Sequence, residues 1–330
     1  MKLFQVFSAV FAVSCWVSAA MAAGPCCGRL AAAEQAVQTQ RPGCAGAGTP
    51  ACPRTGRSDC PVVGAKGCPL KDGWPMTLAA WTFHKETLFD AIDNAQKLGI
   101  RYIELIPSHV VSPEMGDSRF DVNASVALIA KIKTKMERAG VRPLAMYTNG
   151  LNSDEAQCRR VFDFAKVMGI ITINGEPPMD ALPLVDKLAN EYGINVAVHN
   201  HPRPSTYWNP EIVLEAIKDC SPRIGVCADT GHWIRSGLDP VECLKKLEGR
   251  VYWVHFKDLN EVSREAHDVV WGTGEADAGG ILAELKRQNY VGGIAIEYEH
   301  NWGHAMPELG QCVAFYRRTV DALFGAVQEP

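Results

Sequence analysis

Four short apolar segments of this chain each end in a side chain that can coordinate a metal ion. The segments are residues 196–199, 224–229, 251–255 and 294–297, and they end in His199, Asp229, His255 and Glu297. Such runs are typical of buried parallel strands, whose carboxyl ends carry functional side chains. One such run means little, but four in succession indicate a bound cation. Two imidazoles and two carboxylates suit Mn²⁺, Zn²⁺, Co²⁺ or Fe²⁺ better than Ca²⁺.

Eight strands that alternate with helices would position these side chains. The sequence predicts strands at 77–81, 102–106, 142–147, 170–173, 194–199, 224–229, 251–255 and 293–297. It predicts helices at 87–98, 125–139, 153–168, 181–192, 211–219, 240–247 and 280–288. Several of these helices are followed by a glycine, which is a common helix stop. Eight βα units over about 250 residues fit an α/β fold of the closed (β/α)8 TIM barrel type.

An open doubly wound sheet is the alternative fold. Such a sheet usually has a glycine-rich dinucleotide turn after its first strand. Residues 81–84 read Trp-Thr-Phe-His and form no such turn. In a barrel, the carboxyl ends of all strands open on one face, so the four metal-competent side chains are expected to converge there.

The first part of the chain differs in composition from the barrel, which is expected at residues 73–330. Residues 1–23 combine Lys2, an apolar stretch and a small-residue cleavage site, which predicts a signal peptide and an exported, periplasmic or extracellular protein. Residues 24–72 are rich in Cys, Pro and Gly and are expected to form a linker or arm. Six clustered cysteines in an exported chain favour disulfides, with metal binding or free thiols as alternatives.

Composition narrows the possible partners. About 47% of the 330 residues are hydrophobic, which is enough for a large core, and the net charge of −4 gives no reason to expect nucleic acid binding. No apolar run in the body approaches the roughly 20 residues of a membrane span. A homo-oligomer is compatible with the sequence.

The motifs Val-His-Asn-His, Ala-Asp-Thr-Gly-His-Trp, Val-His-Phe-Lys-Asp and Ile-Glu-Tyr-Glu resemble those of the xylose isomerase-like TIM barrels. The resemblance covers about residues 76–325. It implies a sugar isomerase or epimerase whose metal ligands are Asp229, His255 and Glu297, with His199 in the fifth-strand position. The family often has a glutamate there. Its absence puts a symmetric two-carboxylate epimerase mechanism in doubt.

The chemistry expected from this resemblance is proton abstraction next to the carbonyl of a sugar or keto-sugar. A divalent metal (Mn, Co, Zn, Fe or Mg) would stabilise the resulting enediolate. Glu297 is the candidate base, Glu176 the second acid/base, and Lys257 the group that protonates or holds the oxyanion. The small carbohydrate substrate is expected to contact His201, His232, Glu104, Trp81 and Trp233.

Each of these residues also has a structural interpretation. Asp229 and His232 could cap the next helix, His255 could be a core histidine, and the tryptophans could be ordinary core residues. Glu176 could belong to an ordinary Glu-Pro-Pro loop. Two functional alternatives also stay open: a lyase or hydrolase that acts on keto-glycosides with the same metal site, and a barrel that binds carbohydrate without catalysis.

Overall fold

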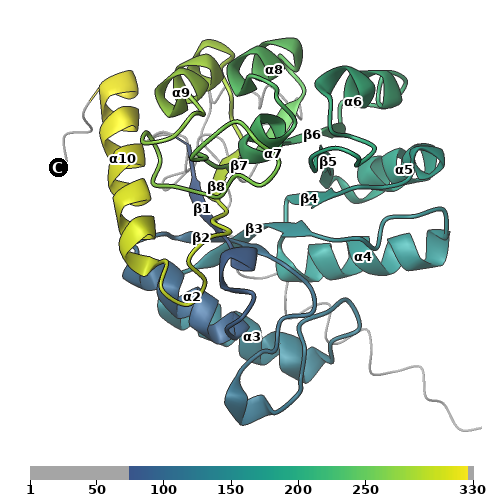
Figure 1. The fold of residues 1–330 in the computed structure, drawn as a ribbon. Coiled ribbons are helices and arrows are strands. Elements are labelled where there is room, and N and C mark those ends of the chain that lie inside the picture. Colours follow the sequence, from purple (N-terminus) through teal and green to yellow (C-terminus); the bar gives the residue numbers. More distant parts are fainter. Residues whose placement is uncertain (1–73, 326–330) are drawn as a thin grey trace, which may run out of the picture. The chain divides into compact units, whose positions relative to one another are not determined.

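The computed structural model describes residues 74–325, in which eight parallel strands close into a barrel in sequence order (Figure 1). The strands are β1 Met76–Ala79, β2 Tyr102–Leu105, β3 Arg142–Tyr147, β4 Thr172–Gly175, β5 Asn195–His199, β6 Ile224–Asp229, β7 Val251–Phe256 and β8 Gly293–Ile296. β1 pairs with both β2 and β8, which closes the sheet. The predicted TIM barrel is therefore confirmed.

Helices surround the barrel (Figure 1). They are α2 Leu88–Lys97, α3 Val126–Ala139, α4 Glu155–Met168, α5 Leu182–Tyr192, α6 Pro210–Ala216, α7 Thr230–Arg235, α8 Pro240–Lys246, α9 Ala278–Arg287 and α10 Met306–Phe324, with short 3-10 helices η2 Ala80–Phe83, η3 Pro113–Met115 and η4 Met179–Ala181. Local signals explain several boundaries. Thr87 and Asp90 form a capping box at the start of α2, and Gly140 ends α3 in the left-handed conformation. The sequence did not predict α7 or α10.

The core has two parts. The larger one fills the space between the strands and the helices, and a smaller one lies among the residues of the strands themselves. The smaller part contains mostly small side chains, Ala79, Ala145, Ala197, Cys227 and Ala295, together with Tyr252 and Trp253. Alanines leave room for the large indole of Trp253, which is almost completely buried.

Several strand boundaries differ from the prediction by one or two residues, and three of them show why. The first strand stops at Ala79, and Trp81 lies in η2, because a short apolar run does not distinguish strand from helix. β4 begins two residues late, because the Ile170 N–H still donates to the Ala165 carbonyl and completes the end of α4. β8 ends at Ile296, so Glu297 is the first residue beyond the strand.

The predicted signal peptide (1–23) and cysteine-rich arm (24–72) lie outside the described residues and stay predictions, as does export. The five cysteines within residues 74–325 are free thiols, and four of them are buried. None of the described helices is both long and apolar enough to span a membrane.

Candidate metal centre

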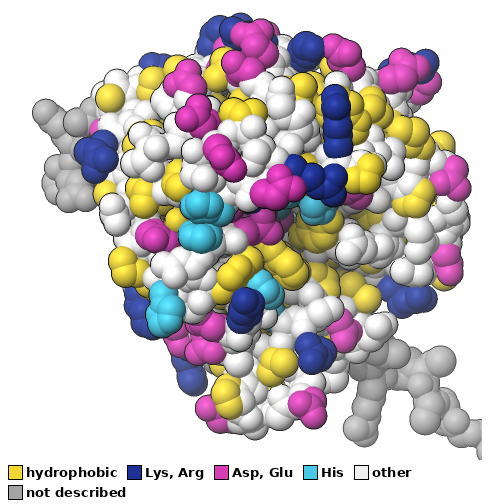
Figure 2. Space-filling model, in the orientation of Figure 1, with side chains coloured by type: hydrophobic (Ala, Val, Ile, Leu, Met, Phe, Trp, Pro, Cys, Tyr) yellow, Lys and Arg dark blue, Asp and Glu magenta, His cyan; other side chains and the backbone are white. Residues whose placement is uncertain are grey.

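The four side chains predicted to bind a metal lie together at the carboxyl ends of consecutive strands. His199 ends β5, Asp229 ends β6, His255 lies near the end of β7 and Glu297 follows β8. One possible ligand atom from each lies within 4.8 Å of the other three, and all four residues are buried. Histidine, acidic and basic side chains gather near the middle of the face seen in Figure 2. We call these four residues the His–Asp–His–Glu cluster.

The donor atoms of this cluster point at one another. His199 Nε2 lies 3.1 Å from His255 Nδ1, which in turn lies 3.1 Å from Glu297 Oε2. Asp229 Oδ2 lies 3.6 Å from His199 Nε2. Nitrogen and oxygen donors that converge in this way suit a cation placed between them.

A carboxylate behind His255 fixes which nitrogen of this ring faces the cluster. Glu104 is fully buried and accepts hydrogen bonds from His255 Nε2 at 2.7 Å, Trp253 Nε1 at 2.7 Å and Asn174 Nδ2 at 2.9 Å. Because a carboxylate only accepts, Nε2 carries the proton and Nδ1 faces Glu297. Glu104 therefore lies beneath His255, where it accepts hydrogen bonds from three protein side chains.

Glu176 occupies the equivalent position behind His199. It follows β4 directly, and its Oε1 lies 3.6 Å from His199 Nδ1. The same carboxylate is hydrogen-bonded to His201 Nδ1, and Ser205 Oγ donates to its other oxygen at 2.7 Å. Burial acts to raise the pKa of Glu176, but its contacts with His199, His201 and Ser205 lower it below the usual range. Carboxylates behind both imidazoles are typical of metal-binding histidines.

Two buried polar atoms of the cluster bear on whether it can hold a metal. Asp229 Oδ2 and His199 Nδ1 are buried and make no hydrogen bond of good geometry within residues 74–325. The Lys257 ammonium lies 3.0 Å from Asp229 Oδ2, and a metal cation held by the four side chains would give this oxygen a further positive partner. Cys227 Sγ also lies near His199 and His255, and burial raises the pKa of this thiol to about 12. Glu176, His199 and His201 form another possible group, but the His–Asp–His–Glu cluster brings together the most donor atoms among the described residues and could hold a divalent metal.

Lys257 places a buried ammonium against this cluster. Its Nζ lies 3.0 Å from Asp229 Oδ2, 2.8 Å from Glu297 Oε2 and 2.7 Å from Glu299 Oε2. Burial opposes the charge, but these three carboxylates raise the pKa of Lys257 well above its usual value. The chain of Lys257 passes over Gly231, where an added Cβ would lie only 2.8 Å from Lys257 Cβ. The glycine of the Asp-Thr-Gly-His motif therefore makes room for this lysine.

His232 and His201 also line the site. His232 is buried, and its Nε2 lies 3.5 Å from Asp229 Oδ2, while Arg235 Nη1 donates to its Nδ1 at 3.1 Å. Because guanidinium only donates, Nδ1 is unprotonated and Nε2 carries the proton. Burial is the main reason that the pKa of His232 is lowered well below its usual value, so this ring is neutral. His201 is the more exposed ring, with 44% of its side chain accessible.

Of the two tryptophans predicted to contact the substrate, one lies at the surface and the other in the core. Trp81 is 38% exposed, and its Nε1 donates to Glu299 Oε1 at 2.9 Å. Trp233 is completely buried in the main hydrophobic core, so the structure does not place it with the other predicted substrate contacts. α7 carries both His232 and Trp233, and because neighbouring helical residues point in different directions, only one of them can face the site.

Sequence reasoning missed a polar network beside Lys257. Arg235 at the end of α7 pairs with Asp268 at 3.3 Å and with Glu299 at 3.4 Å. Burial, opposed by Lys257 and Arg235, raises the pKa of Asp268 to about 7. Glu299 could have been found, because it is two residues beyond Glu297 and side chains of an extended segment alternate. Asp268 lies in a long loop between β7 and α9, where no apolar periodicity in the sequence pointed to it.

Asp258 anchors the loop that begins after β7. Its carboxylate accepts hydrogen bonds from the backbone N–H groups of Gly272, Gly274 and Ala276 at 2.8–3.0 Å. A Cβ at Gly274 would lie 2.2 Å from the Leu259 carbonyl oxygen, so only glycine fits there. Because the Asp258 carboxylate accepts from these three N–H groups, they shape the loop and are not free to bind a phosphate.

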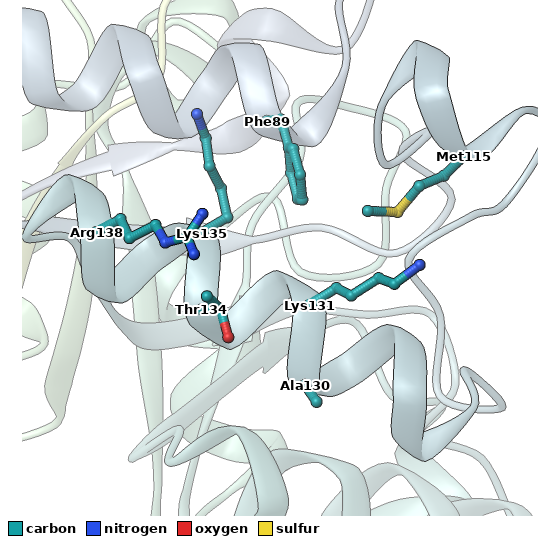
Figure 3. Close-up of a pocket in the computed structure, with 7 residues that line it drawn as sticks. All are labelled: Phe89, Met115, Ala130, Lys131, Thr134, Lys135 and Arg138. Atoms are coloured by element: carbon teal, nitrogen blue, oxygen red, sulfur yellow. The ribbon is translucent and has the colours of Figure 1, made fainter.

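A groove of about 420 Å³ lies elsewhere on the molecule, between α2, η3 and α3 (Figure 3). Its lining residues are Phe89, Met115, Ala130, Lys131, Thr134, Lys135 and Arg138. It contains no residue of the His–Asp–His–Glu cluster. Lys135 in this groove is already paired with Asp93 at 2.5 Å.

Comparison with known proteins agrees with the barrel. The sequence pattern described as xylose isomerase-like TIM barrel matches residues 92–318, more than half of the chain. The chain belongs to the xylose isomerase-like TIM barrel family. The match includes all four residues of the cluster, together with Glu104, Glu176 and Lys257.

Two relatives of about 30% identity match different lengths of this chain. Inosose dehydratase of Bacillus thuringiensis (strain Al Hakam) is 30% identical over 144 residues, which cover 39% of this chain and 48% of that enzyme. The chain thus spans about half the length of the curated relatives it matches. An uncharacterised protein of Parabacteroides distasonis ATCC 8503 is 31% identical, with a TM-score of 0.60 and coverage of 74% of this chain and 98% of the other.

The fold extends to more distant proteins. The crystal structure of IOLI protein, which holds a zinc atom, has a TM-score of 0.60 at 18% identity and covers 76% of this chain and 99% of the other. At this identity the likeness establishes the shared fold alone.

Proposed function

We propose that this protein is a metal-dependent enzyme that removes a proton next to the carbonyl of a sugar or keto-sugar and returns it, so that the sugar is isomerised or epimerised. The observation that carries the proposal is the His–Asp–His–Glu cluster, in which four strand ends each contribute one donor atom. A carboxylate stands behind each imidazole of this cluster. When bound there, a divalent cation supplies Lewis acidity toward a carbonyl oxygen and a neighbouring hydroxyl.

Glu297 is the proposed base. Burial acts to raise its pKa, but His255 and Lys257 beside it lower the pKa well below its usual range, so Glu297 is in the ionised form that a base requires. Lys257 would hold the negative charge that develops on the substrate. With its pKa raised, it is a poor proton donor, which favours this electrostatic role.

Glu176, His201 and His232 are proposed to act on the opposite part of the substrate. Glu176 and His201 form a hydrogen-bonded pair whose histidine is accessible to a ligand. Such a pair can return a proton or hold a hydroxyl group. His232 donates from Nε2 toward Asp229 and is proposed to orient this ligand as well as to touch the substrate.

A lyase reaction on the same kind of keto-sugar is the second candidate. His199 stands where a second glutamate would complete a symmetric pair of carboxylates, and Glu297 is left as the base at that centre. Elimination requires a base at the carbon and an acid at the leaving group, and it does not require carboxylates on both faces of one carbon. The curated relatives named inosose dehydratase also favour this candidate.

Incubation of the metal-loaded protein with ketoses and 3-keto-glycosides in D₂O, followed by NMR, tests both candidates. An isomerase or epimerase should place deuterium on the carbon next to the carbonyl and keep the carbon skeleton. A lyase should release a leaving group and give an unsaturated product. Glu297→Gln should abolish either reaction, whereas Glu248→Gln should not, since Glu248 pairs with Arg287 on the surface. If no compound shows deuterium exchange and none gives a product, the result would count against both candidate functions.

A further inference from the structure

Trp81 presents an aromatic surface whose orientation is fixed from two sides. The ring of His84 stacks on the indole, with 4.4 Å between ring centroids and 18° between planes. Trp302 packs its edge against His84 at 4.1 Å, and the indole Nε1 of Trp81 donates to Glu299. His84 thus covers one face of the indole, while Trp81 as a whole remains 38% exposed. Because His84 occupies one face of the indole, a ligand ring can stack on Trp81 only from the opposite face.

A fixed, exposed indole is well suited to bind a flat apolar face. Most tryptophans of folded proteins are largely buried, so an exposed one that is held in place indicates a contact with another molecule. Because its ring is already oriented, little side-chain freedom is lost when a ligand stacks on it. The CH face of a sugar ring and an aromatic aglycone both provide such a surface.

Three polar contacts connect this indole to the candidate metal centre. Glu299 accepts from Trp81 with one oxygen and lies 2.7 Å from Lys257 Nζ with the other. Lys257 Nζ lies 2.8 Å from Glu297 of the cluster. Trp81 is thus connected to the cluster through two intervening side chains, Glu299 and Lys257. A molecule with one ring at the cluster would place a second, linked ring near Trp81.

The charges inside the site favour a ligand without a phosphate. Lys257 already contacts three carboxylates, and Arg235 contacts Asp268 and Glu299. Binding of a phosphate usually requires a cation that is free to form charge-assisted hydrogen bonds. Both of these cations are committed to protein carboxylates.

We propose that the face of Trp81 opposite His84 is a subsite for a second ring, and that the substrate is an uncharged glycoside whose aglycone or second sugar stacks there. This inference rests on the proposed function, because it names the substrate class of that reaction. It assigns recognition of the linked ring to Trp81 and chemistry to the His–Asp–His–Glu cluster.

Saturation-transfer NMR of the metal-loaded protein with 4-nitrophenyl β-glucoside and with methyl β-glucoside tests the subsite. The nitrophenyl protons should receive strong saturation from the wild-type protein. Trp81→Ala should weaken binding of this probe roughly 3- to 10-fold, and Trp81→Phe should restore it. Trp208→Ala is the matched control and should have no effect, since the ring of this other tryptophan is covered by Arg203 at 3.6 Å.

The subsite would be overturned if the nitrophenyl protons received no saturation from the wild-type protein. Equal saturation from the wild type and from Trp81→Ala would overturn it as well. Displacement of the probe by glucose 6-phosphate more readily than by methyl β-glucoside would overturn the uncharged substrate. The binding readout requires no turnover. A failure of the subsite is therefore distinguishable from a failure of the proposed reaction, which the deuterium experiment reads separately.

Discussion

Replacement of Glu104 by glutamine should weaken metal binding and leave the barrel folded. The carboxylate of Glu104 lies 2.7 Å from His255 Nε2. A hydrogen bond to a charged group contributes about 1.5–3 kcal/mol and a neutral one about 1 kcal/mol, so loss of the charge should cost roughly 1–2 kcal/mol. This energy corresponds to about a tenfold loss of affinity, at the lower end of the 10- to 100-fold typical for such carboxylates.

The environment of Glu104 can accept an amide. Asn174 Oδ1 makes no hydrogen bond among the described residues, so rotation of the Asn174 amide would let it accept from the new NH₂ group. The remaining carbonyl oxygen of the glutamine could still accept from Trp253 and His255. The free energy of unfolding of the metal-free variant should therefore fall by no more than about 1–3 kcal/mol, because Asn174 Nδ2 loses its acceptor on this rotation while the donors of Trp253 and His255 keep theirs.

A competitive titration of Zn²⁺ or Co²⁺ against a chromophoric chelator measures this effect, and urea unfolding of the metal-free protein checks the fold. Glu176→Gln is the matched control, because its carboxylate lies 3.6 Å from His199 Nδ1, beyond hydrogen-bond distance. This variant should lose less affinity than Glu104→Gln. Unchanged affinity in Glu104→Gln, or a larger loss in Glu176→Gln, would refute the assignment of Glu104 as the group that orients His255.

Three further predictions concern the scaffold of the site, and urea unfolding measures all of them. Gly231→Ala should lower the free energy of unfolding by about 1–3 kcal/mol, because its Cβ would collide with Lys257. Gly279→Ala is its control, since an added Cβ there meets nothing within 4 Å. Asp258→Asn should cost about 2 kcal/mol, because three backbone N–H groups lose a charged acceptor; an unchanged midpoint would contradict this. Asp268, with its pKa raised to about 7, keeps a proton that the unfolded chain releases near pH 4, so its contribution to wild-type stability should fall between about pH 4 and 7. Asp268→Asn should flatten that fall, and an identical pH profile in the two proteins would exclude the explanation.

The strand-end residues could be predicted because the barrel topology alone brings them together. Parallel strands that close in sequence order place every carboxyl end on one face, so a polar residue at the end of an apolar run needs no further information. His199, Asp229 and His255 were placed in this way, and Glu297 follows its strand directly.

Contacts around the cluster could not be predicted, because they depend on side-chain directions and loop paths. Glu104 is an inward residue of β2, but only the packing of Trp253 and Asn174 against it shows that it points at His255. Trp233 was expected at the site, yet the turn of α7 directs it into the core. Asp268 reaches Arg235 through a loop whose path no local pattern specifies.

An anomalous diffraction experiment on crystals of the protein loaded with Zn²⁺ or Co²⁺ tests the central claim most directly. The account predicts one anomalous peak enclosed by His199 Nε2, Asp229 Oδ2, His255 Nδ1 and Glu297 Oε2, about 2.0–2.3 Å from each bound donor atom. Full occupancy by metal at another position, with no peak among these four side chains, would contradict it.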